Sequence, residues 1–293
     1  MRIFITGVSS FIGRELIRQC DEQGVTVAGN DLFITDFSRF LIGDIRDASV
    51  ADQIPEGTDA IVHLAALSRD SDCKNNAYSC FDANVMGTLN LMEAAKNRGV
   101  KQFIFASTEW VYDSFNEGEP PKTEESVINI ANLTSEYALS KIVSEVNLRQ
   151  KYLQGFCSVT ILRFGIIYGP RKDNWSAAES LFNSVATSEK LTVGSLRTAR
   201  HFIHVSDIAS AIIKSVGVKG FEILNIQGDR LITLGDIIES SKKITGKNPL
   251  VHESSPDKPS VRRISNKKAK EMLDWAPVFD LEKGLQTFRK FLA

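Results

Sequence analysis

The stretch that decides the fold is "RIFITGVSSFIG", residues 2–13, in which an apolar run enters a turn with two glycines and then a helical sequence. A tight turn between a strand and a helix points the unpaired N–H groups of the helix start at a bound pyrophosphate. Gly7 suits the tight turn and Gly13 the close packing of helix on sheet, whereas Ser10 stands where close phosphate approach usually requires glycine. Taken alone, the pattern also fits an ordinary turn whose serines cap a helix.

Asp31 favours the nucleotide-binding interpretation. It follows a second apolar run, "VTVAG" at residues 25–29, and lies about 20 residues beyond the loop. An acidic side chain at this point accepts hydrogen bonds from the adenosine ribose and repels a 2′-phosphate. We therefore expect NAD rather than NADP, although Asp31 also fits a turn-forming role and Asn30 could share the ribose.

The rest of the chain alternates apolar runs with helix-period segments, which is typical of a parallel sheet wrapped by helices. Strands are expected at residues 2–6, 25–29, 60–66, 102–107 and 158–164, and the clearest helix at 84–99. Beyond Gly169 the pattern loosens into shorter strands, polar loops and two late helices. We predict an α/β fold, a doubly wound parallel sheet, with a dinucleotide-binding domain at 1–169 and a smaller, partly interleaved α/β lobe at 170–293.

Composition and charge exclude several classes of protein. The chain has 293 residues and a net charge of −1, so we expect neither a nucleic-acid nor a membrane partner. No stretch approaches the roughly 20 apolar residues that span a bilayer, and Met1 leads directly into a strand, so we expect a soluble, cytoplasmic protein. The cysteines lack metal-ligand spacing, and we expect no metal and reduced, mostly buried thiols. They are Cys20, Cys73, Cys80 and Cys157.

A candidate acid/base pair lies in "SEYALSK", residues 135–141, which continues with helical period. Tyr137 and Lys141 are four residues apart and share one helix face. A tyrosine acts as a base at neutral pH only if its pKa falls by roughly 3 units, about 4 kcal/mol. A nearby lysine and a cationic nicotinamide could supply that energy, although the spacing also fits an exposed helix face.

Polar residues end the strand predicted at 102–107. Ser107, Thr108 and Glu109 follow "FIFA", and ligands of open α/β sheets bind at the carboxyl ends of strands. A hydroxyl there could hold a substrate oxygen while Tyr137 takes its proton. Each residue alone also fits a chain that is simply leaving the sheet.

Together these segments resemble the extended short-chain dehydrogenase/reductases, in particular the NAD-dependent nucleotide-sugar epimerase/dehydratase family. The motifs that carry the resemblance are "TGVSSFIG", "GDIRD" (43–47), "DAIVHLAA" (59–66), "NVMGTLNLMEAA" (84–95), "FIFASTEWVYD" (103–113), "YALSK" (137–141), "LRFGIIYGPR" (162–171), "RHFIHVSDIA" (200–209), "NIQG" (225–228) and "KAKEMLDW" (268–275). The resemblance implies a Rossmann-like fold, an enzyme that binds NAD and a nucleotide-diphosphate sugar, and a homodimer formed through two helices, one of which bears Tyr137.

The resemblance also implies roles for individual residues. Those that match cofactor contacts are Gly7, Ser10, Phe11, Ile12, Gly13, Asp31, Asp44, Ile45, Leu64, Ala65, Ala66, Tyr137 and Lys141. Those that match the catalytic trio are Thr108 as hydroxyl donor, Tyr137 as acid/base, and Lys141, which binds the nicotinamide ribose and lowers the pKa of the tyrosine. The substrate contacts are Thr108, Glu109, Arg200 and Arg262, and the fork of Arg200 suits a diphosphate.

Three positions depart from the family pattern. Ser10 replaces a glycine, Ile166 stands where an asparagine often contacts substrate phosphate, and the late R-x-G-D motif is missing. Arg262 or Arg263 is offered in its place, and either also fits a solvated basic face.

The reaction is expected to be hydride transfer at C4 of the sugar, and epimerisation is favoured. Dehydratases of the family often have an acid pair after the threonine, and this chain has Glu109 followed by Trp110, whose indole has no acid/base capacity. A 4,6-dehydratase or a 4-keto reductase remains open. So does a sensor or scaffold that binds NAD(H) or a sugar nucleotide without turnover.

Overall fold

The computed structural model describes residues 1–33, 39–112, 115–171 and 176–291. The chain divides into two compact units that interleave along the sequence. Unit 1 comprises Met1–Ser114, Ser126–Arg163 and Ala209–Leu224, and unit 2 comprises Phe115–Glu125, Phe164–Ile208 and Asn225–Ala293. The chain therefore returns to unit 1 after residue 208, within the range 170–293 predicted for a partly interleaved second lobe.

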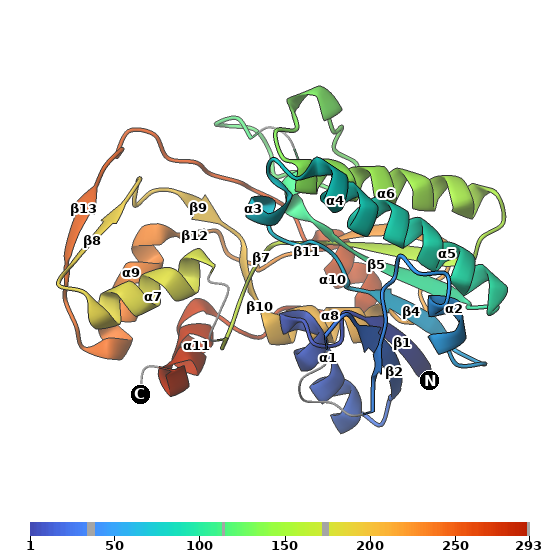
Figure 1. Ribbon diagram of the computed structural model, residues 1–293. Coiled ribbons are helices and arrows are strands. Elements are labelled where there is room, and N and C mark those ends of the chain that lie inside the picture. Colours follow the sequence, from blue (N-terminus) through green and yellow to red (C-terminus); the bar gives the residue numbers. More distant parts are fainter. Residues whose placement is uncertain (34–38, 113–114, 172–175, 292–293) are drawn as a thin grey trace. The chain divides into compact units, whose positions relative to one another are not determined.

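Unit 1 is built on a seven-stranded sheet with the order β11-β6-β5-β4-β1-β2-β3 (Figure 1). The strands are β1 (Arg2–Thr6), β2 (Thr26–Asp31), β3 (Leu41–Ile42), β4 (Ala60–His63), β5 (Gln102–Thr108), β6 (Ser158–Phe164) and β11 (Phe221–Ile226). The pairs β1–β2, β1–β4, β2–β3 and β4–β5 are parallel. The prediction of a doubly wound parallel sheet is confirmed, and β1 and β6 have the predicted bounds.

The strand order reverses direction at β1. The chain passes from β1 to β2 and β3 on one side, and then to β4 and β5 on the other. Thr6, the last residue of β1, lies opposite Asn30 of β2 and His63 of β4, so the carboxyl ends of the three strands meet. Open α/β sheets bind their ligands at such a switch point.

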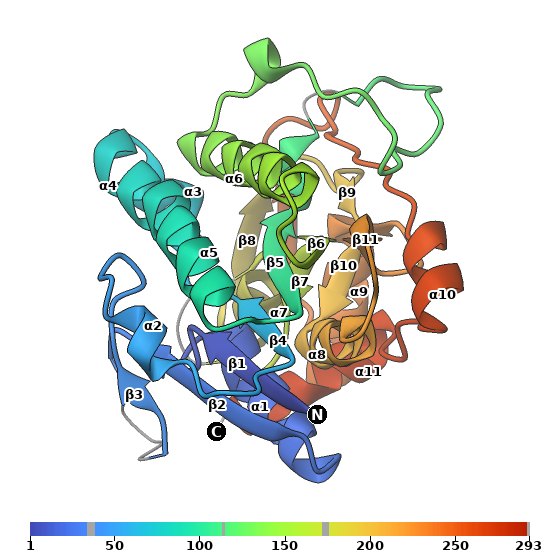
Figure 2. The same cartoon turned by 90° about the vertical axis from the view of Figure 1, so that its right-hand side faces the viewer.

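Helices cover both faces of this sheet. On one face lie α4 (Ala77–Phe81), α5 (Gly87–Asn97) and α6 (Glu136–Leu153), and on the other α1 (Phe11–Glu22) and α8 (Val205–Ser215) (Figure 2). Fully buried side chains such as Phe4, Phe103, Leu91 and Leu148 join strands and helices in one apolar cluster. Burial of this surface is the main term that stabilises the layered arrangement.

The helix predicted at 84–99 is interrupted at its start. Residues Asp82–Met86 form a π-helical turn, η1, and α5 follows at Gly87. Asn84, inside η1, receives a hydrogen bond from Leu67 N at 2.8 Å and donates one to Leu67 O at 3.0 Å. The helix ends as predicted, before Gly99 with φ +63°.

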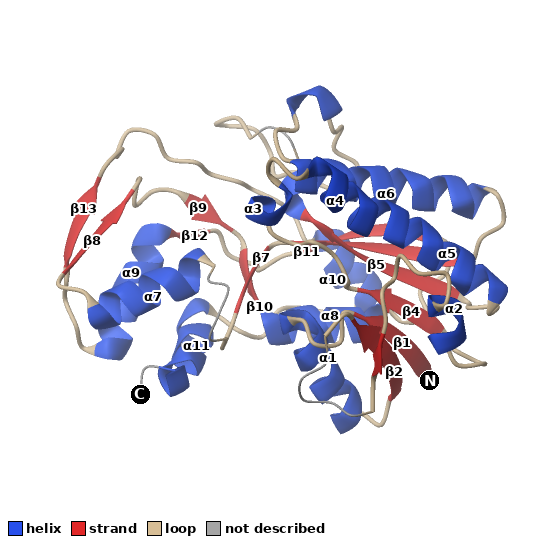
Figure 3. Cartoon of the chain, viewed as in Figure 1, coloured by secondary structure: helices blue, strands red, loops and turns tan. Residues whose placement is uncertain are grey.

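Unit 2 contains three two-stranded sheets and short helices (Figure 3). The sheets pair β7 (Ile166–Tyr168) with β10 (Phe202–His204), β9 (Ala199–Arg200) with β12 (Ile232–Thr233), and β8 (Lys190–Val193) with β13 (Leu250–Glu253). The helices are α7 (Ala177–Thr187), α9 (Leu234–Thr245), α10 (Lys267–Leu273) and α11 (Leu281–Gln286). The two predicted late helices correspond to α9 and α10.

The expectation that all four cysteines are reduced is wrong for two of them. Cys73, at the end of α3 (Asp70–Cys73), is joined to Cys80 of α4, with their Cα atoms 5.1 Å apart. The bend between two short helices brings them together, and their spacing in the sequence gave no sign of it. Cys20 and Cys157 are free, and burial raises the pKa of each thiol to about 12.

Two findings on the described residues concern membranes and metals. None of the helices there combines the length and the apolar character needed to cross a bilayer. No group of three or more His, Cys, Asp or Glu side chains is arranged within these residues to hold a metal ion.

Candidate functional site

The loop between β1 and α1 requires glycine at two positions. Gly7 has φ +80°, and a Cβ added there would lie 2.9 Å from Ala65 N. A Cβ on Gly13 would overlap the carbonyl oxygen of Gly7. The backbone therefore packs too closely for any other residue, which brings the start of α1 against the end of β4.

Ser10 has a local role in this loop. It is the N-cap of α1, and its Oγ accepts a hydrogen bond from Gly13 N at 3.0 Å. Its neighbour Ser9 has a buried Oγ without a hydrogen-bond partner among the described residues. A buried hydroxyl with no partner beside a helix N-terminus could donate a hydrogen bond to an anionic ligand bound there.

Asp31 lies directly beside the loop. It ends β2, and its carboxylate accepts hydrogen bonds from Ser9 N at 2.9 Å and from Leu32 N at 2.8 Å. Two backbone donors fix the orientation of the carboxylate. Its remaining lone pairs can accept hydrogen bonds from hydroxyl groups. The structure thus joins the glycine loop and the acid that the sequence placed about 20 residues apart.

The other predicted cofactor residues lie along the same edge of the sheet. Leu64 N donates to Thr6 O at 3.1 Å, and Ala65 N donates to the Thr6 hydroxyl at 3.3 Å, so the segment after β4 continues beside β1. Asp44 is paired with Arg46, which holds the pKa of that carboxyl below its usual value. Ile45 is 7 % exposed, and its side chain packs against Gly87.

The predicted catalytic trio is assembled by β5 and α6. Thr108 is the last residue of β5 and 6 % exposed, and Tyr137 is in the first turn of α6, whose N-cap is Ser135. Thr108 is hydrogen-bonded to the Tyr137 side chain, which tends to lower the pKa of the phenol. Burial outweighs this and raises the Tyr137 pKa to about 12, so the expected lowering does not come from the protein's own groups.

Lys141 lies one helical turn beyond Tyr137. Its Nζ donates to Ala106 O at 2.8 Å, and it is 4.7 Å from the centre of the Phe105 ring and 5.9 Å from that of Tyr137. Burial lowers the pKa of Lys141 to about 7, and the charge of Glu145 opposes that decrease. Burial thus makes the amine easier to deprotonate than an ordinary lysine.

The sequence also marked the residues that follow Thr108. Glu109 belongs to a 3-10 turn, η2 (Glu109–Val111), and is 1 % exposed, whereas Trp110 is 38 % exposed. Asp113, the last residue of that motif, lies outside the described residues. A buried carboxylate thus lies next to the threonine, with an indole at the surface.

The predicted substrate arginines come together in unit 2. The guanidinium of Arg200 donates to Ser260 O at 2.6 Å and to Ser260 Oγ at 3.0 Å. Both Arg200 Nη1 and Arg262 N donate to Ala199 O, and the Arg262 guanidinium lies 5.4 Å from the centre of the Phe115 ring. The backbone carbonyl of Arg263 accepts a hydrogen bond from Lys122 N.

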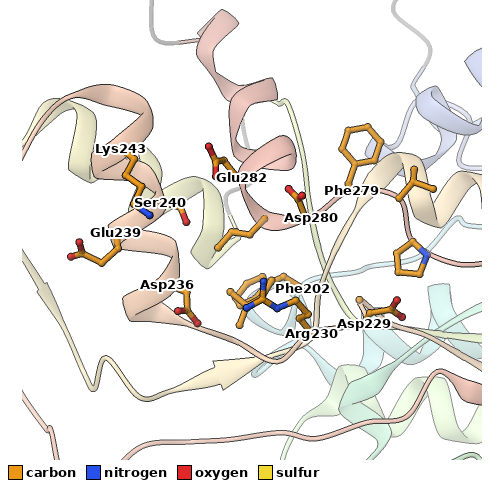
Figure 4. A pocket seen from close by; sticks show the side chains of 15 residues that line it. Phe202, Asp229, Arg230, Asp236, Glu239, Ser240, Lys243, Phe279, Asp280 and Glu282 are labelled. Atoms are coloured by element: carbon orange, nitrogen blue, oxygen red, sulfur yellow. The ribbon is translucent and has the colours of Figure 1, made fainter.

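Unit 2 also has a cavity of about 560 Å³ (Figure 4). Its lining includes the rings of Phe202 and Phe279 and charged side chains of both signs, among them Arg230, Asp236 and Lys243. None of the residues predicted to bind cofactor or substrate is among those that line it. The cavity is therefore separate from the predicted site.

The sequence as a whole matches the model of a protein family, "NAD dependent epimerase/dehydratase family", over residues 3–226. The chain belongs to this family. Its members are NAD-dependent enzymes, and the β1–α1 loop with Asp31 fits that cofactor on its own geometry.

Individual members of the family resemble the chain along nearly all of its length. A UDP-glucuronate 4-epimerase of Thermodesulfobacterium geofontis is 27% identical, over 96% of this chain and 93% of that protein. The UDP-glucose 4-epimerase of Thermotoga maritima, solved with UDP-glucose, has a TM-score of 0.87 and 26% identity, with 100% of each chain covered. A dTDP-glucose 4,6-dehydratase of Streptomyces venezuelae, solved with NAD, has a TM-score of 0.86 and 25% identity over 99% of this chain and 97% of that one.

Several residues that support this site were not singled out from the sequence. His63 links the hydroxyls of Thr6 and Thr88 through its two ring nitrogens, at 2.8 and 2.9 Å. Asn84 donates to Ser140 Oγ at 3.0 Å, and Ser135, the cap of α6, donates to Asp70. Their partners are distant in the sequence, so no spacing pattern indicated them.

Asp31→Ser is expected to weaken NAD binding about 10-fold to 100-fold, because hydrogen bonds to a charged group contribute about 1.5–3 kcal/mol. It should weaken NADP binding less, since the repulsion of the 2′-phosphate is also removed. Calorimetric titration of both cofactors measures the two changes. Asp52→Ser, which alters an exposed carboxylate paired with Arg98, is the control and should leave both affinities unchanged. Equal NAD affinity in Asp31→Ser and the native chain would contradict the role of Asp31.

Proposed function

We propose that the chain is a nucleotide-sugar 4-epimerase that inverts C4 by oxidation and re-reduction. The observation that carries the proposal is the set Thr108, Tyr137 and Lys141 on β5 and α6. β5 is the parallel neighbour of β4, which pairs with β1, so this set lies at the same edge of the sheet as the glycine loop. A phenol, a hydroxyl and an ammonium at the cofactor edge are the groups that proton-coupled hydride transfer needs.

The side chains divide the chemistry between them. When bound, NAD would supply the hydride acceptor for the oxidation at C4 and the hydride donor for the re-reduction. Tyr137 takes the proton of the C4 hydroxyl during oxidation and returns it during reduction. Thr108, hydrogen-bonded to Tyr137, holds the substrate oxygen, and the ammonium of Lys141 stabilises the phenolate.

We propose a UDP-hexose or UDP-hexuronate as substrate. The support is the naming of similar epimerases for UDP-glucose and UDP-glucuronate. Arg200 and Arg262 would bind the diphosphate. Arg200 through its Nη1 and Arg262 through its backbone N both donate to Ala199 O, so the two segments that carry these arginines lie side by side in unit 2, and guanidinium forks suit phosphate oxygens.

A second candidate is 4,6-dehydration, which Glu109 favours. Its carboxylate is buried directly after Thr108, where an acid could protonate a departing hydroxyl. Trp110 offers no base for the proton at C5, so this reaction would need a base from elsewhere. A sensor or scaffold that only binds the ligands would have no use for the set on β5 and α6.

The mass and stereochemistry of the product test the proposal. The chain is incubated with NAD and, separately, with UDP-glucose, UDP-glucuronate, dTDP-glucose and GDP-mannose. An unchanged mass with inverted C4 for a UDP-sugar is the expected result, and NMR identifies the epimer. Loss of water would favour the dehydratase, and a two-hydrogen change with consumption of cofactor would favour a reductase or dehydrogenase. No product and no nicotinamide absorbance change with any substrate would overturn the enzyme reading.

A further inference from the structure

We propose that Glu145 is a positioning residue of this site, whose buried carboxylate, one turn beyond Lys141 on α6, keeps the positive charge on Lys141. The consequence for catalysis rests on the proposed function, whereas the effect on Lys141 does not. The hydrogen-bond partners of Glu145 are Ser107 and Arg163, and its effect on the reaction would pass through Lys141.

Helix α6 and strand β5 are joined residue by residue at this point. Tyr137, Lys141 and Glu145 follow one another at intervals of four residues and so share one face of α6. Three consecutive residues of β5 receive them: Ala106 O accepts from Lys141, Ser107 Oγ donates to Glu145, and Thr108 bonds Tyr137. The catalytic pair and Glu145 therefore form one connected row.

Glu145 is held from two strands. Ser107 Oγ of β5 donates to its Oε1 at 2.5 Å, and Arg163 of β6 donates to both oxygens, at 3.1 Å from Nε and 2.6 Å from Nη2. Arg163 is fixed in turn by Tyr112, whose hydroxyl accepts from Nη1 at 3.1 Å. Glu145 and Arg163 are each 3 % exposed, so neither carboxylate oxygen can turn away to solvent.

The charge of this carboxylate acts directly on Lys141. Burial lowers the pKa of Lys141, and Glu145 raises it. Two other ionisable groups interact with Lys141, Tyr137 on α6, whose ring centre lies 5.9 Å from its Nζ, and His63 on β4. Burial and the charge of Lys141 lower the pKa of His63 to about 3, so the imidazole is neutral near pH 7 and adds no second positive charge beside Lys141.

Removal of the Glu145 carboxylate should change the pKa of Lys141 in one direction, downward. Without Glu145 the effect of burial on Lys141 is unopposed, so its pKa falls below the native value of about 7 and the fraction of neutral amine at pH 7 rises. The protonated form is then present only at lower pH. If the Glu145–Arg163 pair only filled the interior, its removal would leave the titration midpoint of Lys141 unchanged.

Lysine side-chain NMR of the full chain, labelled at lysine Cε and measured without substrate, tests the proposal. The Lys141 signal is identified by its loss in Lys141→Met. We expect the titration midpoint to fall by about one pH unit, a roughly tenfold loss of proton affinity, in Glu145→Gln. Glu145→Asp keeps the charge and should restore most of the native midpoint. Glu179→Gln, which alters a buried ion pair with Arg171 in unit 2, is the matched control and should leave Lys141 unchanged.

A second variant keeps the test valid if the unpaired Arg163 prevents folding. Glu145→Gln combined with Arg163→Gln removes both charges, and we expect a lower midpoint in it as well. An unmoved Lys141 midpoint in a folded variant that lacks the carboxylate overturns the proposal, even if the native chain epimerises a sugar. A lowered midpoint in a chain with no turnover on any nucleotide sugar overturns the proposed function and leaves the role of Glu145 intact. In an active enzyme, the alkaline limb of the kcat profile should move down by the same amount.

Discussion

Tyr137→Phe is expected to lower kcat by about 10³-fold, the middle of the range for loss of a general acid/base, while NAD stays bound. The phenol oxygen is the group hydrogen-bonded to Thr108, and phenylalanine keeps the ring and its packing. Without that oxygen the proton of the C4 hydroxyl loses its proposed acceptor, and Lys141, which donates to Ala106 O, is directed away from it. Steady-state kinetics and calorimetric NAD binding measure the two effects.

The control for this variant lies on the same helix. Tyr152, near the end of α6, packs its ring 5.7 Å from that of Phe221, and Tyr152→Phe removes a hydroxyl without touching the site. Its kcat should stay within about twofold of the native value, which is an effect below 1 kcal/mol. If Tyr137→Phe retained a tenth or more of native activity, another residue would be the acid/base. Loss of both activity and NAD binding would instead indicate a structural role for the phenol.

Arg163→Met is expected to destabilise the protein by about 3–5 kcal/mol, because it leaves the Glu145 carboxylate buried without its counter-ion. The ion pair has a shortest N–O distance of 2.6 Å, and both side chains are about 4 % exposed. Methionine replaces most of the volume of the arginine stem, so the lost charge, rather than a cavity, dominates the change. Urea unfolding followed by circular dichroism measures the free energy of unfolding.

An exposed arginine provides the comparison for Arg163. Arg18 on α1 bonds Glu15 and Glu22 at 2.7 and 2.5 Å, but its side chain is 51% exposed. Arg18→Met should cost less than about 1 kcal/mol, because solvent screens surface ion pairs. Similar losses of stability in the two variants would mean that burial does not determine the energy of the Arg163–Glu145 pair.

The local elements of the fold were readable in the sequence. The strands at 2–6 and 158–164 have their predicted bounds because short runs rich in branched and aromatic residues are typical of strands buried inside a parallel sheet. Gly99 ends α5 as predicted because a positive φ there excludes most other residues. Membership of the family could also be predicted from the sequence, because the family's motifs are short segments whose residues act with close neighbours in the chain.

Other features depended on contacts between distant segments. Ser10 was ambiguous until the structure made it the N-cap of α1, and the π-helical turn at Asn84 depends on Leu67, in a separate loop. Cys73 and Cys80 pair because two short helices bend toward each other. The expected lowering of the Tyr137 pKa is absent from the protein's own groups because burial, which no spacing pattern reports, outweighs the bond to Thr108.

The sequence by itself determined the class of fold and the membership of the family, and it predicted the cofactor loop and, through the family motifs, the catalytic trio, because these depend on periodicity and on residue types a few positions apart. Only the tertiary structure decided the electrostatics of the site. Glu145 acquires its role because β5, β6 and α6 place Ser107, Arg163 and Lys141 around it in an interior that water does not screen. Charges buried together interact according to distance in space, and the sequence reports only distance along the chain.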